Sequence, residues 1–189
     1  MKPKITVALI VLFFAGAILA GCKTGQRPAK GAGGAGGSDA PATGTQIPYN
    51  GSVFVINGDG TVTDIKRKLI WQTCSSGLEF KENKCVGSAE VFTWTPGRRY
   101  CGVLKLRGKS WRLPTVDELK TLVDLNQKKR GTDPAIHQIL FPGTAATLYW
   151  TANRAPVGYD KYAINFNDGR ARVAAVEKPN HVRCVTKGP

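Results

Sequence analysis

Five cysteines carry the most reactive side chains of this sequence. A thiolate can act as a nucleophile or bind zinc when suitable partners stand close by. No two cysteines have the CxxC spacing, and neither histidine, His137 or His181, completes a zinc motif. The pattern therefore argues against a metal site. The cysteines are Cys22, Cys74, Cys85, Cys101 and Cys184.

Four of these cysteines remain if Cys22 belongs to an export signal, as its position after an apolar run suggests. An even number in an exported domain indicates two disulfides, for which three pairings are possible. We favour Cys74–Cys85, which closes a short polar loop, and Cys101–Cys184, which ties the middle of the domain to its last strand. On the loop-entropy model each would stabilise the fold by about 3–5 kcal/mol, the longer loop more.

Other catalytic patterns are also missing from the sequence. An oxidised cysteine is no nucleophile, and we find neither a Ser-His-Asp arrangement nor a close pair of carboxylates. We therefore expect a protein that is not an enzyme and that uses no cofactor.

One stretch, residues 57–64, resembles part of a calcium loop. However, Val55 stands where an oxygen ligand should precede it, and Lys66 takes the place of the glutamate at the twelfth position. The Asn-Gly and Asp-Gly pairs are also strong turn signals. We therefore predict a hairpin between residues 53–56 and 61–63 and no metal.

The N-terminus reads as an export signal. Two lysines precede the apolar run Ile5–Ala20, which is shorter than the ~20 residues of a membrane-spanning helix, so an uncleaved anchor is the less favoured alternative. Leu19-Ala-Gly-Cys22 resembles the lipobox of bacterial lipoproteins, which implies that Cys22 is acylated and becomes the new N-terminus. More than one acyl chain anchors stably. Lys23, in place of a retention aspartate, favours the outer membrane.

The mature chain then divides into a linker and one domain. We assign residues 1–21 to the signal peptide, 22–48 to the lipidated cysteine and a disordered Gly/Ala/Pro linker, and 49–189 to a single domain. The formal net charge is +14, and loss of the signal's two lysines leaves +12. An exported protein with this charge is expected to meet acidic polysaccharide, lipid phosphate or an anionic protein surface, and not nucleic acid.

The basic residues are clustered, and the clusters are the candidate ligand-binding residues. A solvated basic surface without a ligand is the alternative interpretation. The candidates are Arg98, Arg99, Lys105, Arg107, Lys109, Lys128, Lys129 and Arg130.

The helices predicted from the sequence are two. Thr115 and Glu118 have the capping-box spacing, which predicts a helix from Val116 to the basic cluster at 128–130. A first helix is expected within Phe92–Leu106. Residues 134–142 should form a loop with four buried side chains, those of Ile136, Ile139, Leu140 and Phe141. Further strands are expected at 69–71, 148–151, 162–166, 170–176 and 182–185.

Six blocks, taken in order, are similar to the Lcl C-terminal domain family, named for a bacterial collagen-like adhesin. They are Gly58–Asp64, Leu69–Cys74, Trp111–Leu119, Tyr149–Thr151, Asn165–Gly169 and Val182–Val185. The resemblance implies an α+β fold related to C-type lectins and sulfatase-modifying factors, with two helices, short antiparallel strands and two disulfides. In such folds a cysteine of the first helix bonds one in the last strand, which supports Cys101–Cys184.

The remaining large side chains are most simply residues of the fold, and the resemblance suggests a role for the whole protein. Trp71, Trp111 and Trp150 are expected in the core, and Arg112 and Arg183 are expected to pair with carboxylates. Adhesins of this family bind sulfated glycosaminoglycans. The favoured function is thus a lipid-anchored module for acidic or sulfated glycans. The alternative is an accessory structural lipoprotein that binds an envelope protein. We expect a monomer, because the chain lacks a collagen-like stem.

Overall fold

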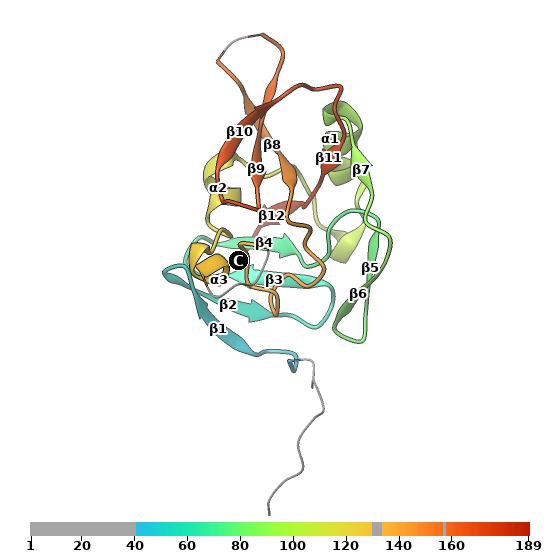
Figure 1. The fold of residues 1–189 in the computed structure, drawn as a ribbon. Coiled ribbons are helices and arrows are strands. Elements are labelled where there is room, and N and C mark those ends of the chain that lie inside the picture. Colours follow the sequence, from blue (N-terminus) through green and yellow to red (C-terminus); the bar gives the residue numbers. More distant parts are fainter. Residues whose placement is uncertain (1–40, 130–133, 157) are drawn as a thin grey trace, which may run out of the picture. The chain divides into compact units, whose positions relative to one another are not determined.

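A computed structural model describes residues 41–129, 134–156 and 158–189. The chain divides into two compact units, residues 1–37 and 38–189, and all described residues belong to the second. They form two five-stranded sheets, one two-stranded hairpin and short helices (Figure 1). The predicted α+β composition is confirmed. None of the helices in the described ranges has the length and apolar character that crossing a bilayer requires.

The first sheet is wholly antiparallel, in the order β1-β2-β3-β4-β12. The predicted hairpin is present, and Gly58 and Gly60 of its turn both have positive φ, which glycine adopts without strain. The predicted domain boundary is too late, because β1 lies almost entirely within the stretch assigned to the linker, and Ile47 packs against the core. The strands are β1 (Gln46–Tyr49), β2 (Ser52–Ile56), β3 (Thr61–Asp64), β4 (Leu69–Gln72) and β12 (Val185–Lys187).

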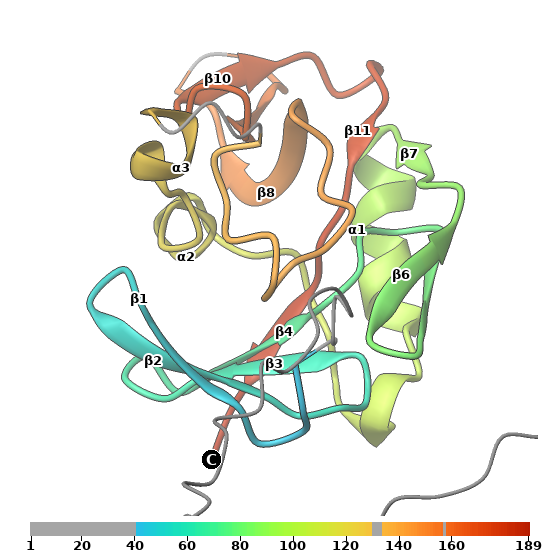
Figure 2. The same ribbon diagram turned by 60° about the horizontal axis from the view of Figure 1, so that its bottom comes forward.

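The second sheet has the order β10-β9-β8-β11-β7. Its strands are antiparallel except for the contact between β8 and β11, which is parallel. The predicted strand at 182–185 is wrong for residues 182–184, which carry the chain from the second sheet to the first (Figure 2). The strands are β7 (Val91–Phe92), β8 (Leu148–Arg154), β9 (Lys161–Asn165), β10 (Ala171–Ala174) and β11 (Asn180–His181).

Both predicted disulfides are present. Cys74–Cys85 fastens the hairpin of β5 (Leu78–Lys81) and β6 (Lys84–Gly87) to the end of β4. Cys101–Cys184 joins helix α1 (Trp94–Val103) to the segment that connects the two sheets. The second bond therefore clamps α1 against the middle of the domain, where the chain passes from one sheet to the other.

The helix predicted from Val116 to the 128–130 cluster is broken. Its start is correct: the Glu118 amide donates to Thr115 Oγ1 at 3.2 Å, and the Thr115 amide donates to Glu118 Oε2 at 2.7 Å. However, α2 (Val116–Lys120) ends after five residues, and a separate helix, α3 (Leu125–Lys129), follows it.

The break has an identifiable cause in the first sheet. In a continuous helix the carbonyls of residues 121–123 would accept bonds from amides four positions later. Here the hydroxyl of Tyr49 donates to the Leu122 carbonyl at 2.6 Å, and the side-chain Nδ2 of Asn50 donates to the carbonyls of the residues before and after Leu122. The Asp124 amide turns away and donates to the carbonyl of Ala135. Side chains far away in the sequence thus decide where the helix stops.

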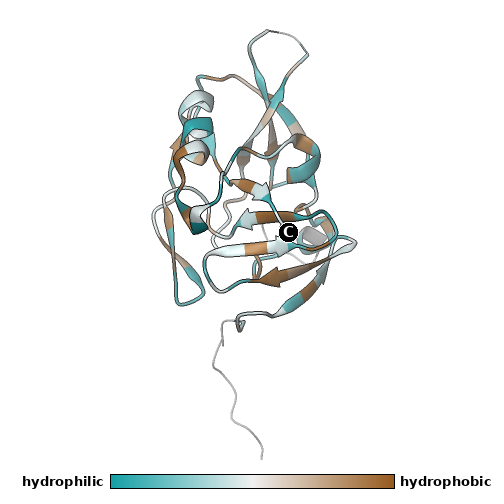
Figure 3. Cartoon of the chain, turned by 180° about the vertical axis from the view of Figure 1, so that it is seen from behind, coloured by the Kyte–Doolittle hydropathy of each residue, from teal (hydrophilic) through white to brown (hydrophobic). Residues whose placement is uncertain are grey.

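The core consists of two clusters of buried apolar side chains, and strands of both sheets contribute to each cluster. Trp71, Trp111 and Trp150 are buried, as predicted. Of the four side chains expected to be buried in the 134–142 loop, three are buried, but Ile139 is 54% exposed. Figure 3 shows apolar residues (brown) on the strands of the first sheet.

Candidate ligand-binding groove

Helix α1 carries its cations outward because its opposite side is tightly packed. Gly97 and Cys101 are its two buried residues. A Cβ atom at Gly97 would lie 2.9 Å from a methyl group of Val182, so the helix backbone sits almost directly on the core. With that side fixed, and further held by the Cys101–Cys184 disulfide, Arg98 and Arg99 are exposed to solvent.

A groove of about 600 Å³ runs between α1, the segment before α2, and β8. Its size falls within the range of small-ligand sites. Two indoles and two guanidinium groups dominate the wall, and we call this feature the α1 groove. Its lining residues are Trp94, Arg98, Gly102, Trp111, Arg112, Leu113, Thr115 and Ala152.

Two cationic side chains lie against the indole ring of Trp94. Its indole nitrogen donates to the Thr151 carbonyl at 2.9 Å, which fixes the ring. The ammonium of Lys161 lies 4.3 Å from the ring centroid and the guanidinium of Arg98 lies 5.8 Å from it. Both distances allow cation–π attraction. The ring therefore gathers two cations, from α1 and from β9, at one place.

Arg112, the second arginine of the groove, is already paired. Its two terminal nitrogens donate to the Glu118 carboxylate at 2.7 and 2.6 Å, so the predicted pairing with a carboxylate is confirmed. These hydrogen bonds raise the pKa of Arg112. Burial alone would raise the pKa of Glu118, but the bonds from Arg112 and Thr115 outweigh it and lower that pKa. Of the two arginines that line the groove, Arg112 is thus paired with a carboxylate, whereas Arg98 forms no ion pair with the described residues.

The predicted basic residues do not form one site. Arg98 lines the groove, and Arg99 lines two smaller hollows of about 390 Å³ each, one of which is also lined by Arg98 and Gly102. Lys105, Arg107 and Lys109 lie in the segment after α1, around the 3-10 turn η1 (Leu106–Gly108), and do not line the groove. Arg130 and the side chains of Lys128 and Lys129 lie outside what the structure describes.

The sequence did not single out Trp94, Arg112 or Lys161 as binding residues. Trp94 and Arg98 are four residues apart, so they share a helix face, and that spacing is a signal that was available. The approach of Lys161 was not, because β9 meets α1 only through the tertiary fold.

The calcium-like turn is held by internal contacts. Asp59 Oδ1 accepts from the amide and hydroxyl of Thr61, and Asp59 Oδ2 pairs with Arg107 at 2.5 Å. The side-chain Nδ2 of Asn57 donates to the hydroxyls of Thr61 and Thr63. The turn therefore closes the β2–β3 hairpin and brings Arg107 to the end of the first sheet.

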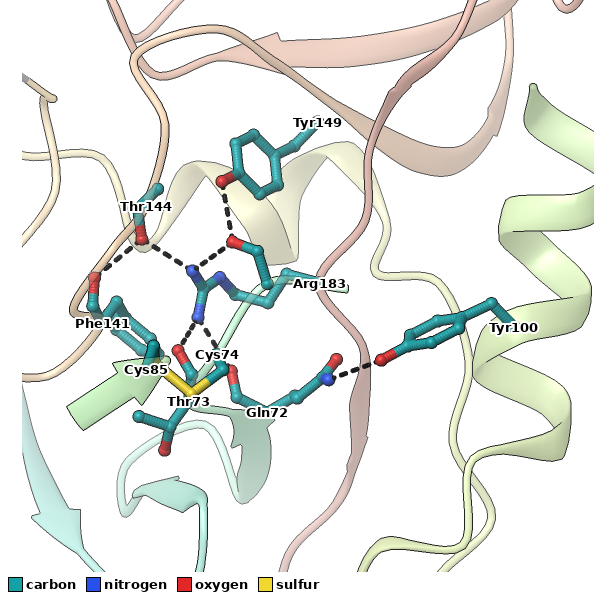
Figure 4. The surroundings of a disulfide bond; sticks show 10 residues. Gln72, Thr73, Cys74, Cys85, Tyr100, Phe141, Thr144, Tyr149 and Arg183 are labelled. Atoms are coloured by element: carbon teal, nitrogen blue, oxygen red, sulfur yellow. Dashed lines mark hydrogen bonds between the residues drawn. A yellow bond between two sulfur atoms is a disulfide. The ribbon is translucent and has the colours of Figure 1, made fainter. Parts of the chain in front are cut away.

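The prediction that Arg183 pairs with a carboxylate is wrong, because no carboxylate among the described residues contacts it. Its side chain is fully buried and donates to the carbonyls of Gln72 and Thr73 and to the hydroxyls of Ser75 and Thr144 (Figure 4). Its guanidinium also lies over the Phe141 ring, 4.8 Å from the centroid. Burial lowers the pKa of Arg183 to about 10. It therefore stays charged at neutral pH and ties the Cys74 region to the 141–144 loop.

Because of His181, we expect the free energy of unfolding to decrease when the solution becomes mildly acidic. Burial, and then the charge of Arg183, lower its pKa. The unfolded chain therefore binds a proton more readily than the folded one, and stability falls as the pH drops below about 6.5. We expect His181→Gln to flatten this fall between about pH 7 and 5.5. Urea unfolding at several pH values measures it, and an unchanged slope in the variant would contradict the assignment.

The groups on the groove wall have the chemistry of an anion site, and the oxygen of the one lining hydroxyl, that of Thr115, takes part in helix capping. Arginine donates parallel hydrogen bonds to planar or tetrahedral oxyanions, and an indole offers an apolar face to a sugar ring. The hydroxyl of Thr115 accepts the helix-capping bond from Glu118. What the wall presents to a ligand is thus positive charge beside aromatic surface.

Comparison with known proteins places this fold in one family. None of the curated proteins matches the chain. The sequence model of the Lcl C-terminal domain matches residues 60–186, which include α1, the α1 groove, Arg183 and both disulfides. This match covers most of the sequence, and the chain therefore belongs to the Lcl C-terminal domain family.

Proposed function

We propose that this protein is a lipid-anchored binding module of the cell envelope that recognises acidic or sulfated glycans and carries out no catalysis. The observation that carries the proposal is the α1 groove, whose wall contains Trp94 and Arg98, together with Lys161, which lies against the same indole ring. No acidic residue occurs from Val91 to Val116, so the segment that carries Arg98 and Arg99 has positive charges only.

The proposed ligand follows from the groups on the wall. Sulfate and carboxylate match arginine, and a pyranose ring has an apolar face that an indole can cover. A polymer of such sugars could continue from the groove onto Arg99, whose hollow adjoins it. Nucleic acid offers similar charge, but we do not propose it for an exported protein.

Three further features belong to the same proposal. The fold is of the C-type-lectin type, supported by the disulfide between the first helix and the segment before the last strand. The chain is anchored through acylated Cys22, facing the periplasm or the outside at the outer membrane, which the lipobox-like Leu19–Cys22 supports. The protein acts as a monomer.

Neutralising the exposed arginines of α1 should weaken binding to a sulfated polysaccharide such as heparin. We expect Arg98→Gln/Arg99→Gln to lower the affinity about 100-fold, since two charge-assisted contacts are lost and each contributes about 1.5 kcal/mol. Wild-type binding should also weaken steeply as salt is raised. Titration calorimetry at low and physiological salt measures both effects.

The matched control is Arg170→Gln/Arg172→Gln, two exposed arginines at β10, on the far edge of the second sheet from β7. Equal losses in both double variants would show diffuse charge attraction and overturn the groove as the site. A wild-type chain that binds no glycan but retains one stoichiometric envelope protein in a pull-down would favour the accessory lipoprotein role instead.

A further inference from the structure

A second group of cations lies beside the point where the N-terminal segment joins the fold. The Gly44 amide donates to the Ile56 carbonyl at 2.7 Å, just before the β2–β3 turn. Thr43 packs so closely on this turn that a Cβ atom at Gly58 would lie 2.0 Å from its hydroxyl oxygen. The next residue of the turn, Asp59, pairs with Arg107 at 2.5 Å. The chain thus enters the domain next to the η1 segment.

A shared cavity confirms this neighbourhood independently. Gly60 of the same turn and Leu106 of η1 line one cavity of about 190 Å³. Figure 2, which brings the first sheet forward, shows the start of β1 and the turn after α1 in the lower half of the view. We call Lys105, Arg107 and Lys109 the tether-proximal surface.

Two of the three cations of the tether-proximal surface form no ion pair with the described residues of the fold. Arg107 is offset by Asp59, but Lys105 and Lys109 are exposed and have no ion pair among the described residues. Neither lysine lines the α1 groove. Close by in the chain, Val103 is 61% exposed at the end of α1. Two ammonium groups and an apolar side chain therefore face solvent in the segment from the end of α1 to just after η1.

We propose that the tether-proximal surface docks on the anionic lipid headgroups of the membrane that holds the chain. The proposal rests on anchoring through Cys22, one part of the proposed function, and it does not depend on the glycan groove. Between the acylated cysteine and the described fold lie residues 23–40, and a Gly-rich chain of that length is expected to span about 20–25 Å. The end of the domain that meets the lipid is then the end that carries Lys105 and Lys109.

The expected strength follows from the charge. Each lysine near an anionic membrane surface contributes about 1 kcal/mol, and this attraction acts within about one Debye length. Two lysines give weak binding on their own. The tether keeps the domain near the surface, so weak attraction is enough to orient it. The α1 groove, formed by other residues, would remain available to a ligand.

The test uses the chain from residue 22 onward with Cys22→Ser, so that binding cannot come from acyl chains. Sedimentation with vesicles of equal parts phosphatidylcholine and phosphatidylglycerol measures the partition coefficient, with pure phosphatidylcholine for comparison. We expect Lys105→Gln/Lys109→Gln to lower it about 30-fold. The matched control, Lys120→Gln/Lys178→Gln, removes two exposed lysines elsewhere and should lower it much less.

Three outcomes would overturn the proposal: equal binding to both vesicle types, an unchanged partition coefficient in Lys105→Gln/Lys109→Gln, or the same loss in the control. Circular dichroism and the urea midpoint establish that each variant is folded. Because these vesicles contain no polysaccharide and the calorimetric titration contains no lipid, either function can fail without the other.

Discussion

Replacing Arg183 by alanine is expected to lower the free energy of unfolding by about 3–5 kcal/mol. The substitution removes a fully buried side chain and leaves two carbonyls and two hydroxyls without their donor. It also leaves a cavity against Phe141, over whose ring the guanidinium lies. Urea unfolding with the disulfides intact measures the change.

Two companion variants separate the possible causes. Arg183→Lys keeps the charge but replaces a planar fork of donors by one ammonium, so we expect a substantial loss that is smaller than that of alanine. Arg172→Ala removes an exposed arginine paired with Asp168 and should cost about 0–1 kcal/mol. A loss below about 1 kcal/mol for Arg183→Ala would show that desolvation of the buried charge cancels its contacts.

Removing the Cys101–Cys184 disulfide should have an effect of similar size. The bond joins residues 83 apart, and the loop-entropy relation gives about 4.5 kcal/mol for a loop of that length. Cys74–Cys85 spans 11 residues, for which the relation gives about 2.8 kcal/mol. We therefore expect Cys101→Ala/Cys184→Ala to be the more destabilised of the two double variants.

The two disulfides also differ in their expected effect on binding. Cys101 anchors α1, so its double variant should bind the sulfated polysaccharide more weakly even under conditions where it remains folded. Cys74 and Cys85 hold a hairpin that does not line the α1 groove, so their loss should leave the affinity unchanged. Unfolding curves and calorimetry on both variants test this. A larger loss of stability for Cys74→Ala/Cys85→Ala would contradict the loop-length argument.

Local features of the fold were predictable because their causes are local. The Asn-Gly and Asp-Gly turn sets the β2–β3 hairpin, and the Thr115–Glu118 spacing sets the start of α2. Each depends on residues within a few positions of one another. The alternation of apolar residues likewise located most strands. The missed strands are all short: β1, β5, β6, β7 and β11 have two to four residues each. Strand β1 also contains a proline, which makes it resemble the linker before it.

Features that depend on distant partners were predicted less well. The end of α2 is set by Tyr49 and Asn50, more than 70 residues earlier in the chain. Arg183 was expected to face a carboxylate, because that is the common way to bury a charge, but carbonyls and hydroxyls from other segments surround it. No spacing in the sequence encodes that enclosure.

By itself the sequence determined the family, the α+β class and the excess of positive charge, and it favoured one of three disulfide pairings, which the structure then confirmed. Only the tertiary structure decided which cations act together. Arg98 lines a groove together with Trp94, and Lys161 of β9 approaches the same indole ring, whereas Lys105 and Lys109, a few residues later, do not line that groove. The physical reason is that charge is a property of composition, while a binding site requires separate segments to converge, and convergence comes from packing of α1 against Val182 and β8.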